Sequence, residues 1–211
     1  MMDDSSISDI KDSTWNNNDG IKEAANNPIQ TDGIIGKAQD FSSDHVNCGT
    51  DSTLNISDTL TIEAWVNPDS LSMVHQNSIV DRGISYWFLV LVNSRLAFLR
   101  FNSGGFGLIS TLETIPTGTY THVAVGFDTY DPLEVKLYIN GELSIEGSLD
   151  GLIDNTNSAV LLGDKGPNVH PFDGIIDEVR ISNTERGAAW IKASYKSGRD
   201  SLLSFGSEET T

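Results

Sequence analysis

Oxygen-bearing side chains crowd into one short segment near the N-terminus, DSTWNNNDG at residues 12–20. Asp12, Asn16, Asn18 and Asp19 offer carboxylate and amide oxygens within these nine residues. Proteins bind Ca²⁺ through about six to eight oxygens of these kinds. The segment is therefore a candidate calcium loop. The alternative is a polar loop closed by its own side-chain-to-backbone hydrogen bonds, which Asp and Asn form readily.

A second oxygen donor lies in PFDGIIDEVRISN, residues 171–183, where closely spaced Ile and Val residues predict a strand. Asp177 stands in the middle of this strand, where a buried carboxylate needs an ionic partner, a hydrogen-bonding partner or a metal. Arg180 or a lysine could supply that partner, and a calcium ion could replace it. A strand this rich in Ile and Val also needs a neighbouring strand and a core.

Aromatic side chains at loops and strand ends are candidates for ligand recognition. Sugars are held when their C–H faces stack on flat rings and polar side chains bond to their hydroxyl groups. Trp87 and Tyr130 are the rings, and His170 the polar side chain, that we predict to bind a ligand. The alternative for each ring is packing in the core, which takes up most aromatic residues.

Patterns typical of catalysis are missing from the sequence. The four histidines, His45, His75, His122 and His170, do not show the H-x-x-x-H spacing of a zinc site. No G-x-S-x-G nucleophile motif occurs, and Cys48, the one cysteine, has no histidine at a recognisable spacing. We therefore predict that the chain is not an enzyme.

The elements that must position these residues are mostly short strands. Alternation of apolar and polar residues, the turn signal Asn140-Gly141, and turn residues at regular spacing predict roughly a dozen of them. Such a series is typical of an all-β antiparallel sandwich or barrel, and the only helix is expected near the C-terminus. The clearest segments are TDGIIGKAQDF (31–41), TLTIEAWVNP (59–68), THVAVGFD (121–128) and EVKLYINGELSIEG (134–147) for strands, and ERGAAWIKASYKSG (185–198) for the helix.

Composition narrows the partners of this 211-residue chain. It has 13 basic and 30 acidic residues, and its net charge of −17 argues against nucleic acid and against anionic membrane surfaces. No apolar run is long enough to insert into a membrane, and a single cysteine permits no intramolecular disulfide. The first residues do not form a signal peptide. Either the protein is not exported or this is a domain of a longer exported chain, and we favour the second interpretation.

Six segments, in this order, resemble a concanavalin A-like jelly roll of the laminin-G-like type: DSTWNNNDG, GIIGKAQDF, LNISDTLTIEAWVNP, YTHVAVGFD, VKLYINGEL and PFDGIIDEVRISN. The resemblance covers roughly residues 10–197 and includes modules of large bacterial and archaeal cell-surface proteins. It implies one domain over residues 1–211, with a core of about 10–206 and two antiparallel sheets, one concave and one convex. It also implies carbohydrate binding, adhesion or contact with another protein.

The same resemblance implies a structural calcium ion between the N-terminal loop and the last long strand, held by Asp12, Asn16, Asn18 and Asp177. Glycoside hydrolases of this fold carry Glu-x-Asp-x-x-Glu, whereas DGIIDEVR lacks the first glutamate. The expected function is a non-catalytic module of an extracellular or cell-surface protein that binds a glycan or a surface protein. The alternatives are a structural spacer of a surface layer or fibre and, less favoured, a divergent glycoside hydrolase. The sequence leaves the oligomeric state open.

Overall fold

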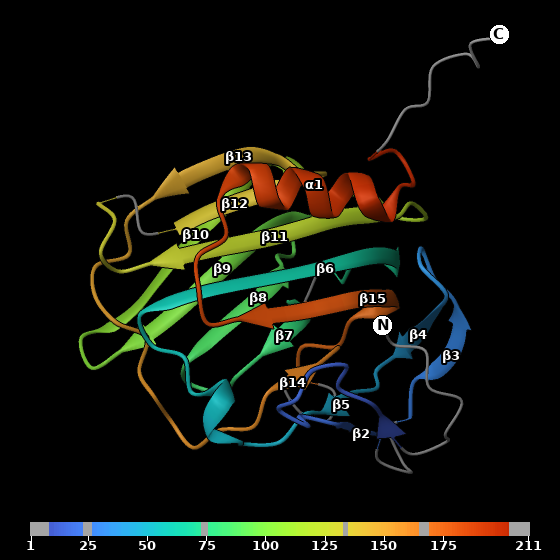
Figure 1. The fold of residues 1–211 in the computed structure, drawn as a ribbon, viewed down its shortest axis with the longest axis horizontal. Helices are drawn as coiled ribbons and strands as arrows, with labels where there is room; N and C mark the ends of the chain where they lie inside the picture. The colour runs from blue at the N-terminus through green and yellow to red at the C-terminus, as the bar shows by residue number, and fades with distance from the viewer. Residues whose placement is uncertain (1–8, 23–26, 73–75, 133–134, 165–168, 203–211) are drawn as a thin grey trace, which may run out of the picture.

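The computed structural model describes residues 9–22, 27–72, 76–132, 135–164 and 169–202. Two antiparallel sheets lie face to face, and one helix crosses the outer surface of one of them (Figure 1). The predicted all-β, two-sheet sandwich with one short C-terminal helix is therefore confirmed.

The first sheet has eight strands and forms the rear layer in Figure 1. Its strands follow the order of the chain except that the late strand β14 lies between β5 and β7. In spatial order the strands are β1 (Asp9–Ile10), β2 (Gly20–Lys22), β5 (Val46–Asn47), β14 (Leu161–Leu162), β7 (Asn77–Asp81), β8 (Tyr86–Val90), β9 (Arg95–Asn102) and β10 (Gly105–Thr114).

The second sheet has seven strands and carries the helix α1 (Ala188–Gly198) on its outer face. A short 3-10 helix (Ser52–Leu54) lies in the connection that leads to it from the first sheet. In spatial order the strands are β13 (Glu142–Gly147), β12 (Val135–Ile139), β11 (Thr121–Asp128), β6 (Thr59–Ser70), β15 (Asp173–Ser182), β4 (Lys37–Ser42) and β3 (Ile29–Asp32).

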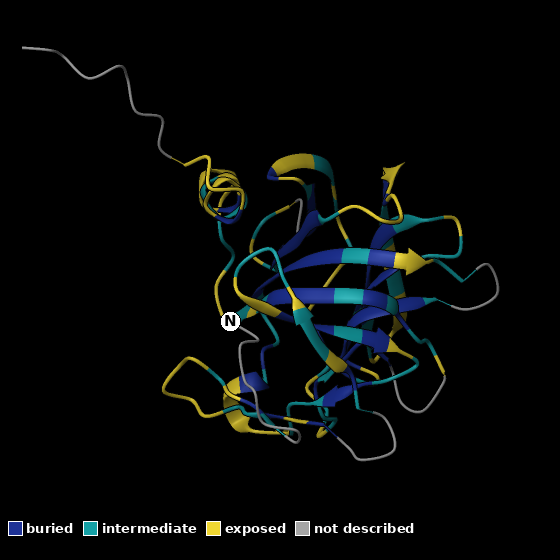
Figure 2. Ribbon diagram, turned by 90° about the vertical axis from the view of Figure 1, so that its right-hand side faces the viewer, coloured by how far each residue is buried: buried dark blue, intermediate teal, exposed yellow. Residues whose placement is uncertain are grey.

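One apolar core fills the space between the sheets, since each strand turns every second residue inward. From β6, Leu60, Ile62 and Ala64 point into it, and Phe88 and Phe98 meet them from the eight-stranded sheet. These five side chains are fully buried, and Figure 2 shows the same continuous burial along the central strands.

Strand β15 lies inside its sheet, between β6 and β4, as the pattern of residues 171–183 predicts. Its pairing with β6 shifts register between Asp177 and Arg180, and Glu178 there has a φ of 48°. This bulge changes the phase of the strand. Ile176 before it and Ile181 after it therefore both face the core.

The prediction of a single strand over residues 31–41 is wrong. The chain turns back at Gly33–Gly36, so the segment forms the hairpin of β3 and β4. Ile34 and Ile35 sit in the turn and remain partly exposed. The sequence also predicts a last short strand in SLLSFGSEETT, residues 201–211, and most of this segment lies outside the described residues.

Helix α1 begins at Ala188, three residues later than its pattern predicts, and packs on the seven-stranded sheet. Ile191 is fully buried against Ala124 and Tyr138. Tyr195 stacks on Trp65 of β6 with ring centroids 5.6 Å apart. The inner side of the helix is therefore apolar and its outer side solvent-exposed (Figure 2).

A buried polar contact between Glu63 and His122 lies between this helix and its sheet. Glu63 is 3% exposed, and its carboxylate is 3.4 Å from Nε2 of His122. The indole N–H of Trp190 donates to the same carboxylate at 3.3 Å. Burial alone would raise the pKa of Glu63, but hydrogen bonds from His122 and Ser194 outweigh it and the pKa is lowered.

Candidate functional site

Four rings form a line on the outer face of the eight-stranded sheet. We call Phe106, Phe101, Trp87 and His170 the aromatic row. Ring centroids are 6.2 Å apart between Phe106 and Phe101, 4.9 Å between Phe101 and Trp87, and 5.2 Å between Trp87 and His170. The row crosses β10, β9 and β8 and ends on the segment before β15.

Strand alternation explains why these rings face outward. In β8, Tyr86 and Phe88 point into the core, which leaves Trp87 on the opposite face. The hairpin of β9 and β10 places Phe101 directly opposite Phe106. Side chains at such opposed positions are close enough to pack together.

Exposure within the row increases toward the sheet edge. Phe106 lies on the edge strand β10 and is 71% exposed, whereas the other three rings are partly buried. The indole N–H of Trp87 donates to the carbonyl of Gly83, which holds the ring in place. The backbone N–H of His170 donates to Asp164 at 2.8 Å. The row is thus a fixed aromatic surface, open at the Phe106 end.

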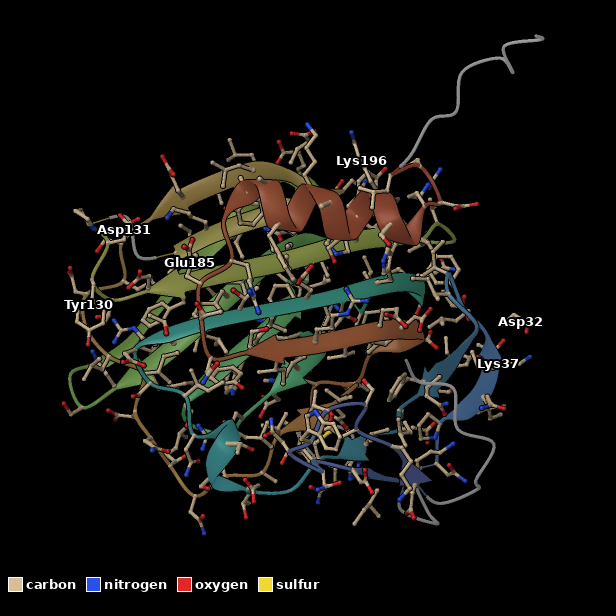
Figure 3. All side chains as sticks on the ribbon, viewed as in Figure 1. Asp32, Lys37, Tyr130, Asp131, Glu185 and Lys196 are labelled. Atoms are coloured by element: carbon tan, nitrogen blue, oxygen red, sulfur yellow. The ribbon has the colours of Figure 1, made fainter. Side chains whose placement is uncertain are left out.

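Of the three predicted ligand-binding residues, the structure brings two together. Trp87 and His170 are in contact, but Tyr130 lies apart from them on the loop between β11 and β12. It is 77% exposed and lies next to Asp131 at one end of the sandwich (Figure 3). Neither Phe101 nor Phe106 was among the three predicted ligand-binding residues. The register of the hairpin 95–114 is the signal that pairs them.

The predicted calcium loop is closed by its own hydrogen bonds. The carboxylate of Asp12 accepts from the backbone N–H groups of Thr14 and Asn18, each at 2.9 Å, and from the Thr14 hydroxyl at 2.7 Å. These bonds hold the pKa of Asp12 below its usual value, although burial opposes the shift. The Asn18 side chain donates to Thr53 at 3.0 Å. Asp12 and Asn18 therefore already have partners within the protein.

Asp177 contacts a different part of the chain. Its Oδ2 accepts from the backbone N–H groups of Ile34 and Ile35, at 2.8 and 3.3 Å, and its Oδ1 accepts from the N–H of Glu178 at 2.8 Å. Burial raises the pKa of this fully buried carboxyl, while the three N–H groups act in the opposite direction. Asp177 thus caps the β3–β4 turn, and among the described residues neither Arg180 nor a lysine is its hydrogen-bonding partner.

Gly33 makes this capping contact possible. A Cβ atom at position 33 would overlap the Oδ2 of Asp177 and would come within 3.1 Å of Ala38. Only glycine lets the turn approach the carboxylate this closely. The contact joins two segments 143 residues apart, so the late strand does tie down the beginning of the chain.

A cavity of about 610 Å³ lies between the predicted calcium loop and the later part of β15. Its lining includes Asp12, Asn16 and Asn18 on one side and the β15 segment from Val179 onward on the other, but not Asp177. Within the described residues, no three His, Cys, Asp or Glu side chains are grouped so that they could hold a metal. An ion shared by all four predicted ligands would have to replace the hydrogen bonds of both Asp12 and Asp177. The calcium site stays a prediction.

Comparison with known families identifies the fold. Residues 40–192 match the family model described as the concanavalin A-like lectin/glucanases superfamily. The chain belongs to this superfamily. The resemblance seen in the sequence is thereby confirmed over most of the chain. A search of curated proteins found no significant match.

Solved structures of similar shape include several binding domains. The binding domain of paraclostridial mosquitocidal protein 1 has a TM-score of 0.70 and 18% identity, covering 90% of this chain and 52% of that one. Domain 4 of the arabinanase AbnA from Geobacillus stearothermophilus has a TM-score of 0.62 and 24% identity, covering 78% of this chain and 79% of that one. The CBM40 of the Ruminococcus gnavus IT-sialidase has a TM-score of 0.61 and 16% identity, covering 79% of this chain and 97% of that one. The chain spans about half of the toxin domain, and these identities show a shared fold alone.

The described part of the chain contains no helix that is both long enough and apolar enough to cross a membrane.

Proposed function

We propose that this superfamily member is a non-catalytic, glycan-binding module that holds its ligand on the aromatic row. The observation that carries the proposal is the contact of Trp87 with both Phe101 and His170, next to the exposed ring of Phe106. Flat rings stack on the C–H faces of sugars, and a histidine offers hydrogen bonds to hydroxyl groups. A row on a rigid sheet provides both without moving the backbone.

The similar structures support a glycan as ligand. Domain 4 of the arabinanase was solved with arabinotriose, and the sialidase CBM40 with α2,3-sialyllactose. Both are parts of glycan-processing enzymes, and the arabinanase is extracellular. We extend this to the present chain as a module of an exported protein. The shared fold makes this reasonable, because the same sandwich serves as a binding module beside other domains.

Two of the three carboxylates of β15, those of Asp177 and Glu178, support the non-catalytic part of the proposal. A glycosidase needs two carboxyl groups that both reach the scissile bond. Asp177 is fully buried with both oxygens bonded to backbone N–H groups, and the carboxylate of Glu178 pairs with Arg180 at 2.6 Å. Neither is available as an acid or nucleophile in this arrangement.

A second candidate function, contact with a surface protein, is favoured by the edge strand β10. Phe106, Leu108 and Leu112 are 71%, 41% and 70% exposed on one strand. Exposed apolar residues that cluster in this way often mark a protein interface. A glycan ligand and a protein partner would use overlapping parts of this surface.

Screening on a glycan array, followed by titration calorimetry with a bound glycan, tests the proposal. We expect Trp87→Ala and Phe106→Ala each to weaken binding roughly fivefold, since stacking on one ring contributes about 1 kcal/mol. Tyr130→Ala and Trp15→Ala remove exposed rings that lie outside the row and should leave binding unchanged. Equal losses in all four variants, or an array without a single bound glycan, would disprove the aromatic row as a sugar site.

A further inference from the structure

We infer that the cavity beside β15 binds an extended, acidic segment of a partner protein, which adds to the seven-stranded sheet as a short strand. We call this cavity of about 610 Å³ the β15 groove. Its lining shares no residue with the aromatic row, so the inference does not depend on the proposed glycan binding. The edge of the strand, the size of the groove, a ring at its rim and its charge each support it.

Strand β15 is paired along its whole length on one side only. On the side of β6 its pairing continues to Ser182, but on the side of β4 it stops at Ile176, because the chain turns back into β3 beyond that point. In Figure 1 the arrowhead half of β15 accordingly extends past β4. Among the described strands, none pairs with this edge after Ile176. An unpaired strand edge is a template for another strand.

The β15 groove follows this edge. Its lining includes four consecutive strand residues, Val179–Ser182. Successive side chains of a strand point to opposite faces, so a cavity that touches all four lies along the backbone edge. The opposite wall comes from the N-terminal loop and the 3-10 helix. The groove therefore lies where a further strand of the sheet would lie.

The size and floor of the groove suit a short extended peptide. A strand in a sandwich takes about 3.3 Å of length, 4.8 Å of width and 10 Å of depth per residue, on the order of 160 Å³. The groove thus holds about four residues. Leu54, Ile56 and Leu162 of the core line it, so every second side chain of the peptide should be apolar. Added strands bind through main-chain hydrogen bonds and are selected through alternate side chains.

Trp15 stands at the rim of the groove. It is 99% exposed and lies between Thr14 and Asn16, which both line the groove. A ring this exposed has almost no packing within its own chain, and Trp is enriched among the residues that dominate protein interfaces. We therefore expect the Trp15 ring to pack on the bound segment.

The charge of the lining is opposite to that of the whole chain. Lys11, Arg180 and Arg186 line the groove with Asp12 as the one acidic residue, although the net charge of the chain is −17. Arg186 stacks on the Trp190 ring at 4.2 Å, and its Nε is buried without a hydrogen-bond partner. A carboxylate of the bound segment would supply an anionic partner to this arginine.

Panning of a phage-displayed library of random octapeptides on the full chain tests the inference. Enriched peptides should carry apolar residues at alternate positions, at least one Asp or Glu, and no proline among the central residues. A synthetic copy should slow hydrogen exchange at the backbone amides of residues 179–182 several-fold. Methylation of one alternating set of its amides should abolish binding, because those groups face β15. Protection of β10 in place of β15 would overturn the inference.

Matched variants identify the side chains that contact the peptide. Trp15→Ala and Arg186→Gln should each weaken peptide binding about fivefold or more, and the loss in Arg186→Gln should shrink at about 0.5 M NaCl. Trp87→Ala and Arg95→Gln make the same changes on β8 and β9 of the other sheet and should leave peptide binding unchanged. Equal losses in all four variants would contradict a site at β15.

The same measurements distinguish the occupant of the groove. If deletion of residues 203–211 tightened peptide binding about tenfold, the C-terminal segment of this chain would be the occupant, and the partner peptide would be ruled out. Failure of the library to yield any binding peptide would remove the inference and would leave glycan binding on the aromatic row unaffected.

Discussion

Asp177 shows how one buried carboxylate can stabilise the fold through hydrogen bonds. Its position in the middle of a strand predicted either a salt bridge or a metal, because an isolated buried charge is costly. The structure satisfies it with three backbone N–H groups, two of them from a turn early in the chain. Backbone donors carry no sequence signature, so this solution could not be anticipated from residue types.

Removal of this contact should destabilise the whole domain. We expect Gly33→Ala to cost about 1–3 kcal/mol, because its Cβ would overlap Asp177. Asp177→Ala should cost about 2–4 kcal/mol, since it leaves buried N–H groups without an acceptor. Urea unfolding measures both changes.

Gly187→Ala is the matched control for this experiment. Position 187 has an ordinary φ of −66° and open space around a new Cβ, so the free energy of unfolding should stay within about 0.5 kcal/mol of wild type. A Gly33→Ala protein as stable as the Gly187→Ala protein would contradict the proposed role of the turn.

Helix α1 illustrates packing at the level of elements. Its moderate apolar face is not enough to hold an isolated helix of 11 residues in water, so the sheet must stabilise it. Ile191 and Tyr195 supply apolar contact, and Gly198 lets the last turn approach the Trp65 ring, which a Cβ would meet at 2.7 Å. The Glu63–His122 pair adds a buried polar contact beneath the same helix.

This pair predicts a specific dependence of stability on pH. The pKa of Glu63 is lower in the folded state than its ordinary value of 4.5, so its ionisation favours folding. The contribution is present above about pH 4.5 and is lost as the pH falls through the folded-state pKa. Between about pH 5 and about pH 3, wild type should therefore lose more stability than Glu63→Gln. Urea unfolding at each pH gives the two slopes.

Glu142→Gln provides the comparison, because Glu142 of β13 also contacts this helix. Glu142 pairs with Lys192 at 2.6 Å, but both side chains are largely exposed, and such pairs contribute little. Its acid slope should match that of wild type. If Glu63→Gln also follows the wild-type slope, the buried pair does not contribute to acid stability.

At the scale of the whole molecule, the predicted calcium ion would stabilise the fold, and this effect can be measured. The loop residues Asp12, Asn16 and Asn18 remain its predicted ligands. Any divalent cation will screen a chain of net charge −17, so a rise in melting temperature with calcium alone is not specific.

The calcium prediction therefore requires a comparison of cations. Calcium should raise the melting temperature by several degrees more than magnesium at equal ionic strength, and a chelator should reverse the rise. Asp12→Ala should abolish the difference between the two cations, whereas Asp32→Ala, which removes an exposed carboxylate on the β3–β4 hairpin (Figure 3), should not. Identical melting curves in calcium and magnesium would exclude a specific calcium site.

The sequence by itself determined most of the strands and which of their faces are buried. Alternation of apolar residues is a local property, so Leu60 and Ile62 of β6 and Phe127 of β11 could be assigned to the core before any neighbour was known. The helix and the antiparallel class followed in the same way. The prediction failed at residues 31–41, where an Ile-rich turn has the composition of a strand.

Only the tertiary structure decided the partners of the functional residues. Trp87 and His170 come from distant segments, and their contact depends on the order of strands in the sheet, which no local pattern specifies. The same is true of Asp177, whose donors lie in the β3–β4 turn. Local chemistry selects the residues that can bind a ligand, but long-range strand pairing brings them together, and that pairing is a property of the whole chain.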